Sequence, residues 1–356
     1  MGPFIGGKGS IAMRPQASDS QQGKLALPEE PAASARADAI LRALLSRLAA
    51  LLSAIREDPR LLCGVILVAL VLAAIFAPFI APYAPLKYHP AIAAQPPSAA
   101  HWLGTDALGR DQLSRVIYGA RISLSVGAGA ILLGGLIGCA LGIVAGYARG
   151  WIDQGTTVLV DALLAFPSLI LALAIAAALG SGVTNVVIAL AIVRIPIYVR
   201  LARAQTLQLR GLDYVTAARA VGTPAWRILL RHIFPNIFSP LLVQATLSVS
   251  FAILDESVLS FLGLGAQPPN PEWGTMINDA QPYLTGGTDP WMILGPALAI
   301  TITVLSLNLL GDSLRDRLDP HTARLLGLRS STAADSALLD EAPETASEAT
   351  TEAAPD

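Results

Sequence analysis

The sequence predicts an all-α polytopic membrane protein with six transmembrane helices. Hydrophobic residues make up 53% of the 356 residues and charged residues only 14%, which is far outside the range of soluble domains. The apolar residues are gathered into long runs, and a run of roughly 20 residues crosses about 30 Å of hydrocarbon as a helix. Segments rich in proline, glycine and charge separate these runs, so each run is expected to be a separate span.

The two ends of the chain are predicted to be disordered. Residues 1–37 are rich in Gly, Pro, Ala, Ser and Gln without an apolar period, and they lack the apolar region of a signal peptide. Residues 326–356 form an acidic tail with one basic residue, Arg329, near its start. The stretch Gly2 to Lys8 approaches a phosphate-binding loop, but Gly9 replaces the hydroxyl residue that would bind Mg²⁺. We therefore expect no nucleotide site in this chain.

An amphipathic helix is predicted over residues 38–58. Apolar residues recur at helical spacing from Ile40 to Ile55, with Arg42, Arg47 and Arg56 between them. This pattern is typical of a helix that lies along the membrane interface. A polar-flanked extension of the first span is the alternative.

The six spans belong to a permease domain predicted over residues 59–325. They are expected at about 61–81, 122–147, 156–179, 185–201, 237–262 and 291–310. The second carries small residues at close-packing intervals, among them Gly134, Gly138 and Gly142, which favours a central place in the bundle. Cys63 and Cys139 both lie inside apolar runs, so we interpret them as small packing residues and not as a disulfide.

Lysine and arginine predict the orientation of the spans. The loop between the fourth and fifth spans and the segment after the sixth are rich in arginine, whereas residues 263–290 have no basic residue. By the positive-inside rule, both termini and the first of these loops are cytoplasmic. Four basic residues then fall on the outside, and Asp106 and Asp111 are expected to neutralise two of them. These four are Lys87, Arg110, Arg115 and Arg121.

The cytoplasmic stretch from Asp213 to Pro235 is too polar for lipid and predicts two short helices. Asp213 is expected to cap the first, and Gly222 to close it in the left-handed conformation. Thr223 would cap a second helix that begins at Pro224 and ends at Pro235. Helical spacing puts one apolar set on a single side of this second helix: Trp226, Leu229, Leu230 and Ile233.

Ionisable residues within the spans are costly and therefore informative. Asp161 in the third span and Arg194 in the fourth are predicted to be able to pair, either to fix two helices together or to act in a translocation path. Glu256, next to Asp255 in the fifth span, is predicted to line that path or its outer gate. The histidines His89, His101, His232 and His321 have no metal-ligand spacing, so no metal site is expected.

Several motifs resemble one family. HWLGTDALGRDQLSR from His101 and YGARISL from Tyr118 are similar to the opening signature of one transmembrane subunit of dipeptide, oligopeptide and nickel ABC importers. The stretch after Asp213 resembles the EAA motif of such subunits, although Thr216 replaces its glutamate and His232 its isoleucine. Three later stretches also resemble this subfamily, and they run from Ala252 to Gly265, from Pro268 to Gly274 and from Asn308 to Pro320.

The resemblance implies a type I ABC importer permease fold and a non-catalytic subunit that imports di- or oligopeptides, with nickel or another small solute as the alternative. The loop 207–235 would couple the spans to an ATPase subunit. The implied coupling residues are Asp213, Tyr214, Thr216, Ala217, Ala218, Arg219, Gly222, Arg231 and Pro235. The basic side chains of this loop contact either that partner or lipid headgroups.

The same resemblance implies the partners. They are a second homologous permease subunit, one or two ABC ATPase subunits, an extracytoplasmic substrate-binding protein and membrane lipid, with no nucleic acid. ATP and Mg²⁺ would be held by the ATPases, so no cofactor is expected on this chain, and the location would be the bacterial inner membrane. An ion-gradient transporter with Asp161 and Arg194 as relay groups would need inverted repeats, which the sequence lacks. An intramembrane enzyme would need catalytic motifs, which are also missing.

Overall fold

Residues 59–285 and 289–318 are described by the computed structural model, and nearly all of them lie in helices or in the loops between helices. The only extended pairing in these ranges is an isolated bridge between Thr105 and Asp111. The predicted disorder of residues 1–37 and 326–356 and the predicted interfacial helix at 38–58 lie outside the described residues.

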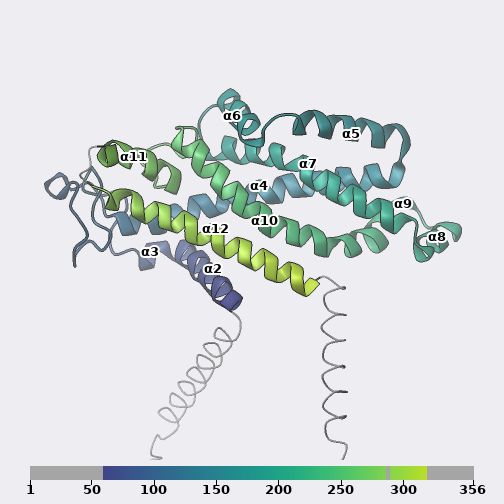
Figure 1. Cartoon of the computed structure of the whole chain (residues 1–356), viewed down its shortest axis with the longest axis horizontal. Helices are drawn as coiled ribbons and strands as arrows, with labels where there is room; N and C mark the ends of the chain where they lie inside the picture. The colour runs from purple at the N-terminus through teal and green to yellow at the C-terminus, as the bar shows by residue number, and fades with distance from the viewer. Residues whose placement is uncertain (1–58, 286–288, 319–356) are drawn as a thin grey trace, which may run out of the picture. The chain divides into compact units, whose positions relative to one another are not determined.

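The helices follow the order of the predicted spans (Figure 1). Their bounds are α2 Pro59–Ile75, α3 Ala77–Ile80, a 3₁₀ turn Pro90–Ile92, α4 Gln112–Ala148, α5 Gly150–Leu164, α6 Ser168–Leu179, α7 Val183–Arg210, α8 Asp213–Ala220, α9 Ala225–Ile228, a π-helical turn Leu229–Ile233, α10 Phe234–Phe261, α11 Trp273–Thr285 and α12 Trp291–Leu318.

Among the described residues, four helical stretches are long and apolar enough to cross a membrane alone: α4, α7, α9 to α10 and α12. The bent pair α5 and α6 makes a fifth candidate, and α2 contributes a shorter apolar helix, Leu61–Ile75. The prediction of an all-α polytopic membrane protein is therefore confirmed, with six apolar segments in the expected order.

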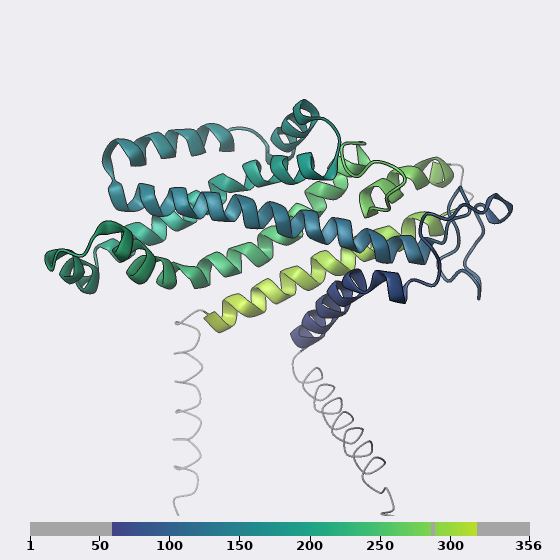
Figure 2. The same ribbon diagram turned by 180° about the vertical axis from the view of Figure 1, so that it is seen from behind.

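The third span differs from its prediction as one straight helix over 156–179. It is broken between α5 and α6, whose axes meet at 91°. The break falls at Ala165 to Pro167, where the proline ring disfavours a helical conformation for the preceding Phe166 and removes one N–H donor. As a result the two halves of the third span run in different directions (Figure 2), and both contact α7, α6 through its buried residues Ala172 and Ala176.

Close packing between α4 and α7 confirms the prediction made from the glycines of the second span. A Cβ atom added at Gly134 would lie 2.5 Å from the Ala191 carbonyl oxygen, and one at Gly142 would lie 2.5 Å from that of Val199. Gly138 faces Ile195 in the same way, with 2.6 Å between an added Cβ and the carbonyl oxygen. Since only glycine leaves room for this approach, α4 and α7 form the centre of the bundle.

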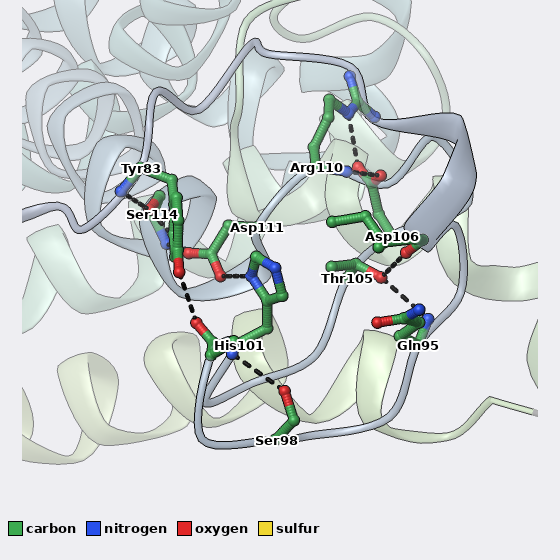
Figure 3. A network of polar contacts seen from close by, with 11 residues as sticks. Tyr83, Gln95, Ser98, His101, Thr105, Asp106, Arg110, Asp111 and Ser114 are labelled. Atoms are coloured by element: carbon green, nitrogen blue, oxygen red, sulfur yellow. Dashed lines mark hydrogen bonds and ion pairs between the residues drawn. The ribbon is translucent and has the colours of Figure 1, made fainter.

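The segment from His101 to Arg115 closes the end of the bundle that lies opposite α8 (Figure 3). Gly104 and Gly109 both have positive φ, and a side chain at Gly109 would collide with the backbone of His89. Asp111 caps α4 by accepting from the Ser114 N–H at 2.8 Å, and it also contacts the His101 ring at 2.8 Å. The helix then continues without a break to Ala148, so it begins before the second span predicted at about 122–147.

Two of the basic residues of this end, Arg110 and Arg115, pair with Asp106, which is one of the two predicted partners. Asp106 lies 2.5 Å from the Nε atom of Arg110 and 3.5 Å from that of Arg115, and it also accepts from the Arg110 backbone N–H at 2.9 Å. Asp111 instead serves as the helix cap. Asp279 of α11 supplies the second carboxylate near the two arginines, a role that the sequence did not reveal.

Candidate coupling and translocation site

The loop between α7 and α10 forms the two short helices predicted for it, α8 and α9. The capping residues are shifted by one position: Leu212 precedes α8, Asp213 is its first helical residue, and Pro224 stands before α9 and not inside it. Neither helix has a side-chain cap, so the predicted capping by Asp213 and Thr223 was wrong.

Gly222 ends α8 in the conformation that the sequence predicted. Its φ is +81°, its N–H donates to the Arg219 carbonyl at 3.0 Å, and the Thr223 N–H donates to the Ala218 carbonyl at 3.1 Å. These two bonds make a Schellman motif, which satisfies carbonyls that the end of a helix would otherwise leave unpaired. Open space surrounds the position, because a Cβ there would meet no atom within 4 Å.

Pro235 does not end the second helix, which corrects the prediction. The π-helical turn at Leu229–Ile233 leads directly into α10, and Pro235 lies in the first turn of α10. Ala225–Phe261 is one 37-residue helical stretch. A proline is tolerated where the hydrogen-bond pattern already changes, since its missing N–H leaves no regular bond broken. The loop is therefore joined rigidly to the fifth span.

The π-helical turn also changes which side chains share a face. Ile228 and Ile233 are fully buried together with Val215 of α8, whereas Trp226 and Leu230 are 60% and 63% exposed. The predicted apolar side of the second helix is thus divided between the core and an exposed apolar groove. Of the coupling residues implied by the resemblance, Ala218 is half-buried and the others are exposed.

One of those coupling residues, Arg219, has a contact within the chain. Its guanidinium lies 5.4 Å from the centre of the Tyr147 ring at the end of α4, and that of Arg210 lies 5.6 Å from the same ring. Arg210 also donates through Nη1 to the Tyr147 carbonyl at 2.7 Å. Cation–π contacts of this kind hold α8 against the end of α4.

The predicted pair between Asp161 and Arg194 is not formed. Asp161 pairs with Arg200 at 2.6 Å, and Arg194 pairs with Asp255 of α10. α5 packs against α7 in a register that brings the Asp161 carboxylate to Arg200. The sequence also gave no sign of Asp153 of α5, which pairs with Arg203; both residues fall outside the predicted spans.

The α7 arginines differ in exposure. The side chains of Arg200 and Asp161 are 60% and 55% exposed, whereas those of Arg194 and Asp255 are 8% and 20% exposed. Charged side chains in a membrane protein face the bundle interior, water or another protein, because contact with lipid tails is costly. The pair of Asp161 and Arg200 therefore lies on a face of α5 and α7 that suits contact with water, lipid headgroups or another protein.

Glu256 is fully buried. Ser257 and Ser260 lie 3.3 and 3.4 Å from its two carboxylate oxygens, and the Ser260 hydroxyl also bonds Glu272 of the following loop. Glu272 accepts in addition from the Ala266 N–H at 2.7 Å. No arginine or lysine among the described residues forms an ion pair with either glutamate. A role of Glu256 in an outer gate stays a prediction, and Glu272 is a buried partner that no sequence pattern pointed to.

The stability of the segment around Glu272 is expected to fall as the pH rises. Burial raises the pKa of Glu272 from 4.5 to about 7, although the Ala266 N–H acts in the opposite direction. The fold therefore favours the neutral carboxyl. The neutral Glu272 carboxyl contributes about 3 kcal/mol at most to the free energy of unfolding. This stabilisation is complete below the pKa of Glu272 in the unfolded chain and is lost as the pH rises through about 7.

Thermal unfolding of the purified protein between pH 5 and 8 checks this expectation. Glu272→Gln, which keeps the shape and stays neutral, should flatten the decline seen in the unmodified chain. Asp289→Asn, just before α12, serves as a control and should show the same decline of stability with pH as the unmodified chain. An equal pH dependence in the Glu272→Gln variant would rule out Glu272 as its origin.

A multi-pass helical bundle with an exposed two-helix loop continuous with one of its spans has the architecture of a membrane transport subunit. Residues 138–324 match the family of binding-protein-dependent transport system inner membrane components, and residues 60–97 match the N-terminal transmembrane domain of oligopeptide transport permease C. The chain belongs to the first of these families, as a non-catalytic multi-pass membrane component.

Three relatives illustrate the likeness. The dipeptide transport system permease protein of Alkalihalophilus pseudofirmus is 45% identical over 72% of this chain and 84% of the relative. The di/tripeptide transport system permease protein of Pseudomonas aeruginosa is 47% identical over 70% and 84%. The glutathione transport system permease protein of Pectobacterium atrosepticum is 44% identical over 75% and 88%.

Proposed function

We propose that this chain is the permease subunit of an ATP-driven importer of peptides and forms half of the translocation path. The substrate class rests on the relatives, which are named for dipeptides, di- and tripeptides and glutathione. The other half of the path comes from a second, homologous permease subunit, and an extracytoplasmic binding protein delivers the peptide. ATP and Mg²⁺ are held by one or two ATPase subunits, and this chain binds no cofactor.

The observation that carries the proposal is the continuity of the loop with the spans. α8 exposes Tyr214, Thr216 and Ala217, while its buried Val215 packs against the loop's own second helix. A displacement of α8 passes to α10 through the continuous stretch Ala225–Phe261 and to α4 through Tyr147. Docking of an ATPase subunit on α8 would in this way move two spans as a rigid body.

The proposed orientation places α8 and both termini in the cytoplasm of a bacterium, with the spans in the inner membrane. It is supported by the arginine-rich loop and by the neutralisation of Arg110 and Arg115 at the opposite end. The exposed pair of Asp161 and Arg200 is assigned to the translocation path or to its border with the second permease subunit. The buried Arg194, paired with Asp255, is assigned to the joint between α7 and α10, and Glu256 to the outer gate of the path.

Gly222→Arg is the test of the coupling assignment. The open space at Gly222 allows a long side chain without a clash inside the chain, but the arginine would project from the docking face. In vesicles with the complete transporter, peptide uptake should fall at least about tenfold while insertion in the membrane stays normal. Ala218→Glu, which adds a charge on the same helix, should have the same effect.

Gly222→Ala is the matched control, because it introduces the same backbone strain at positive φ with little bulk. It should retain most of the uptake. Normal uptake coupled to ATP hydrolysis in both Gly222→Arg and Ala218→Glu would contradict the assignment of α8 as the coupling helix.

A further inference from the structure

A cavity of about 400 Å³ lies at the end of the bundle opposite α8, and we call it the distal pocket. Five segments surround it: the loop before α4, the start of α4, the loop between α10 and α11, α11 and the start of α12. The lining residues that give the pocket its chemical character are Tyr88, Arg110, Gln112, Arg115, Met276 and Asp279. None of them lies in the coupling loop or in the ion pairs that the α7 arginines form.

Two buried guanidinium groups line this pocket. The Arg110 and Arg115 side chains are 7% and 3% exposed, and both lie against the single carboxylate of Asp106. Figure 3 shows the contact between Arg110 and Asp106. Asp106 is held in place by the backbone N–H groups of Leu108 and Arg110, each at 2.9 Å. One fixed carboxylate therefore lies between two positive charges and balances only one of them.

Among the described residues, the positive charge that Asp106 leaves unbalanced has only a distant counter-ion, Asp279. Asp279 is 52% exposed, and its Oδ2 atom lies 3.8 Å from Nη2 of Arg110 and 3.9 Å from Nη2 of Arg115. Both distances are longer than a hydrogen bond. Asp279 therefore acts as a counter-ion at the rim that a better-placed anion can replace.

The hydrogen-bonding groups of the pocket are also incompletely used. Nη1 of Arg115 and Oε1 of Gln112 are both buried, and neither has a hydrogen-bond partner. Unpaired buried polar groups of this kind are costly, and a ligand or ordered water commonly satisfies them. The aromatic ring of Tyr88 lies 5.6 Å from the Arg110 guanidinium, and Met276 and Met292 supply apolar walls.

We propose that the distal pocket binds a carboxylate group, which takes the place of Asp279 between Arg110 and Arg115. A planar guanidinium pairs with a carboxylate through two parallel hydrogen bonds, and two such groups, of which Arg115 has an unpaired donor at Nη1, favour this anion over a neutral ligand. The carboxylate comes either from the terminus of a free peptide or from an acidic side chain of the binding protein. These two sources rest on the proposed function, whereas carboxylate binding itself does not.

The test uses trifluoroacetate as the probe and follows its ¹⁹F NMR line width. The complete transporter is held in nanodiscs of uncharged lipid without ATP, so a failure of coupling cannot affect the result. Trifluoroethanol serves as the neutral control probe. Line broadening is expected with trifluoroacetate and not with trifluoroethanol.

Asp279→Asn is the decisive variant, because it removes the competing carboxylate from an exposed position without disturbing the buried network. It should tighten trifluoroacetate binding by about tenfold, and Asp289→Asn should leave binding unchanged. Arg115→Gln should weaken binding; if this variant fails to fold, Asp279→Asn still decides. Equal binding in the unmodified chain, Asp279→Asn and Arg115→Gln, or equal broadening by trifluoroethanol, would overturn the proposal.

Competition then separates the two sources. Dialanine that displaces trifluoroacetate, where dialanine amide does not, identifies a free peptide terminus. Displacement by the unloaded binding protein alone identifies an acidic side chain of that protein. If neither competes for the probe in Asp279→Asn or in the unmodified chain, a carboxylate from these sources does not occupy the distal pocket.

Discussion

Gly138→Leu is expected to prevent stable assembly of the membrane bundle. A Cβ atom at this position would lie 2.6 Å from the Ile195 carbonyl oxygen and 2.7 Å from Cβ of Tyr198. Neither atom is the end of a flexible side chain, so α4 and α7 would have to separate along the close contact that also includes Gly134 and Gly142. Overpacking a core commonly costs about 1–3 kcal/mol, and a backbone collision on the central helix pair should exceed this.

The amount of folded protein recovered from membranes and its thermal midpoint in detergent measure this effect. Gly155→Leu in α5 is the matched control, since the same substitution is made at a helical glycine whose Cβ would meet no atom within 4 Å. It should be recovered at normal levels. A similar fall in recovery and thermal midpoint for both variants would show that leucine destabilises the protein for a reason other than the α4–α7 contact.

The sequence was most informative where one residue type has a single structural use. Gly138 and its neighbours predicted the close approach of α4 to another helix, because small residues at regular intervals serve that purpose in membranes. Gly222 predicted the end of α8 for a similar reason, since a helix often closes with a residue of positive φ. Long apolar runs likewise predicted the order of the apolar helical segments that the structure describes.

Proline was a poor guide to helix ends. Pro167 separates α5 from α6, yet Pro196 and Pro240 lie inside the unbroken helices α7 and α10, and Pro235 lies where α10 begins. A proline inside a helix leaves one backbone carbonyl without its N–H donor. The helix tolerates the proline where a neighbouring helix or a local π-helical turn satisfies that carbonyl, and breaks where nothing does. That depends on packing between segments distant in sequence, which a single sequence does not display.

The wrong pairing of Asp161 had the same physical origin. Asp161 lies in α5, before the break at Pro167, and its partner on α7 is Arg200 and not Arg194. The partnership of Glu272 with Ser260 was equally hidden, because Glu272 lies in a loop without periodicity and becomes buried only when α11 packs beside α10. Charge identities are visible in a sequence, but their partners depend on the three-dimensional register of helices.

Arg194→Met is expected to destabilise the bundle strongly and to reduce peptide uptake. The side chain of Asp255 is 20% exposed and has Arg194 as its ion-pair partner, so removal of the cation leaves a charged carboxylate inside a membrane-spanning helix. Breaking one side of a buried pair typically costs about 3–5 kcal/mol, whereas replacing both partners with apolar residues is often nearly neutral. The double variant Arg194→Met with Asp255→Leu should therefore be more stable than Arg194→Met alone.

Thermal midpoints of the two single variants and the double variant give the coupling energy, and uptake by each of them in vesicles separates two roles for the pair. If the pair only joins α7 to α10, the double variant recovers both stability and uptake. If Arg194 also acts on the translocated peptide, the double variant recovers stability but uptake stays low. Additive losses of stability would contradict the pairing itself, because two residues that do not interact have no shared free energy to recover.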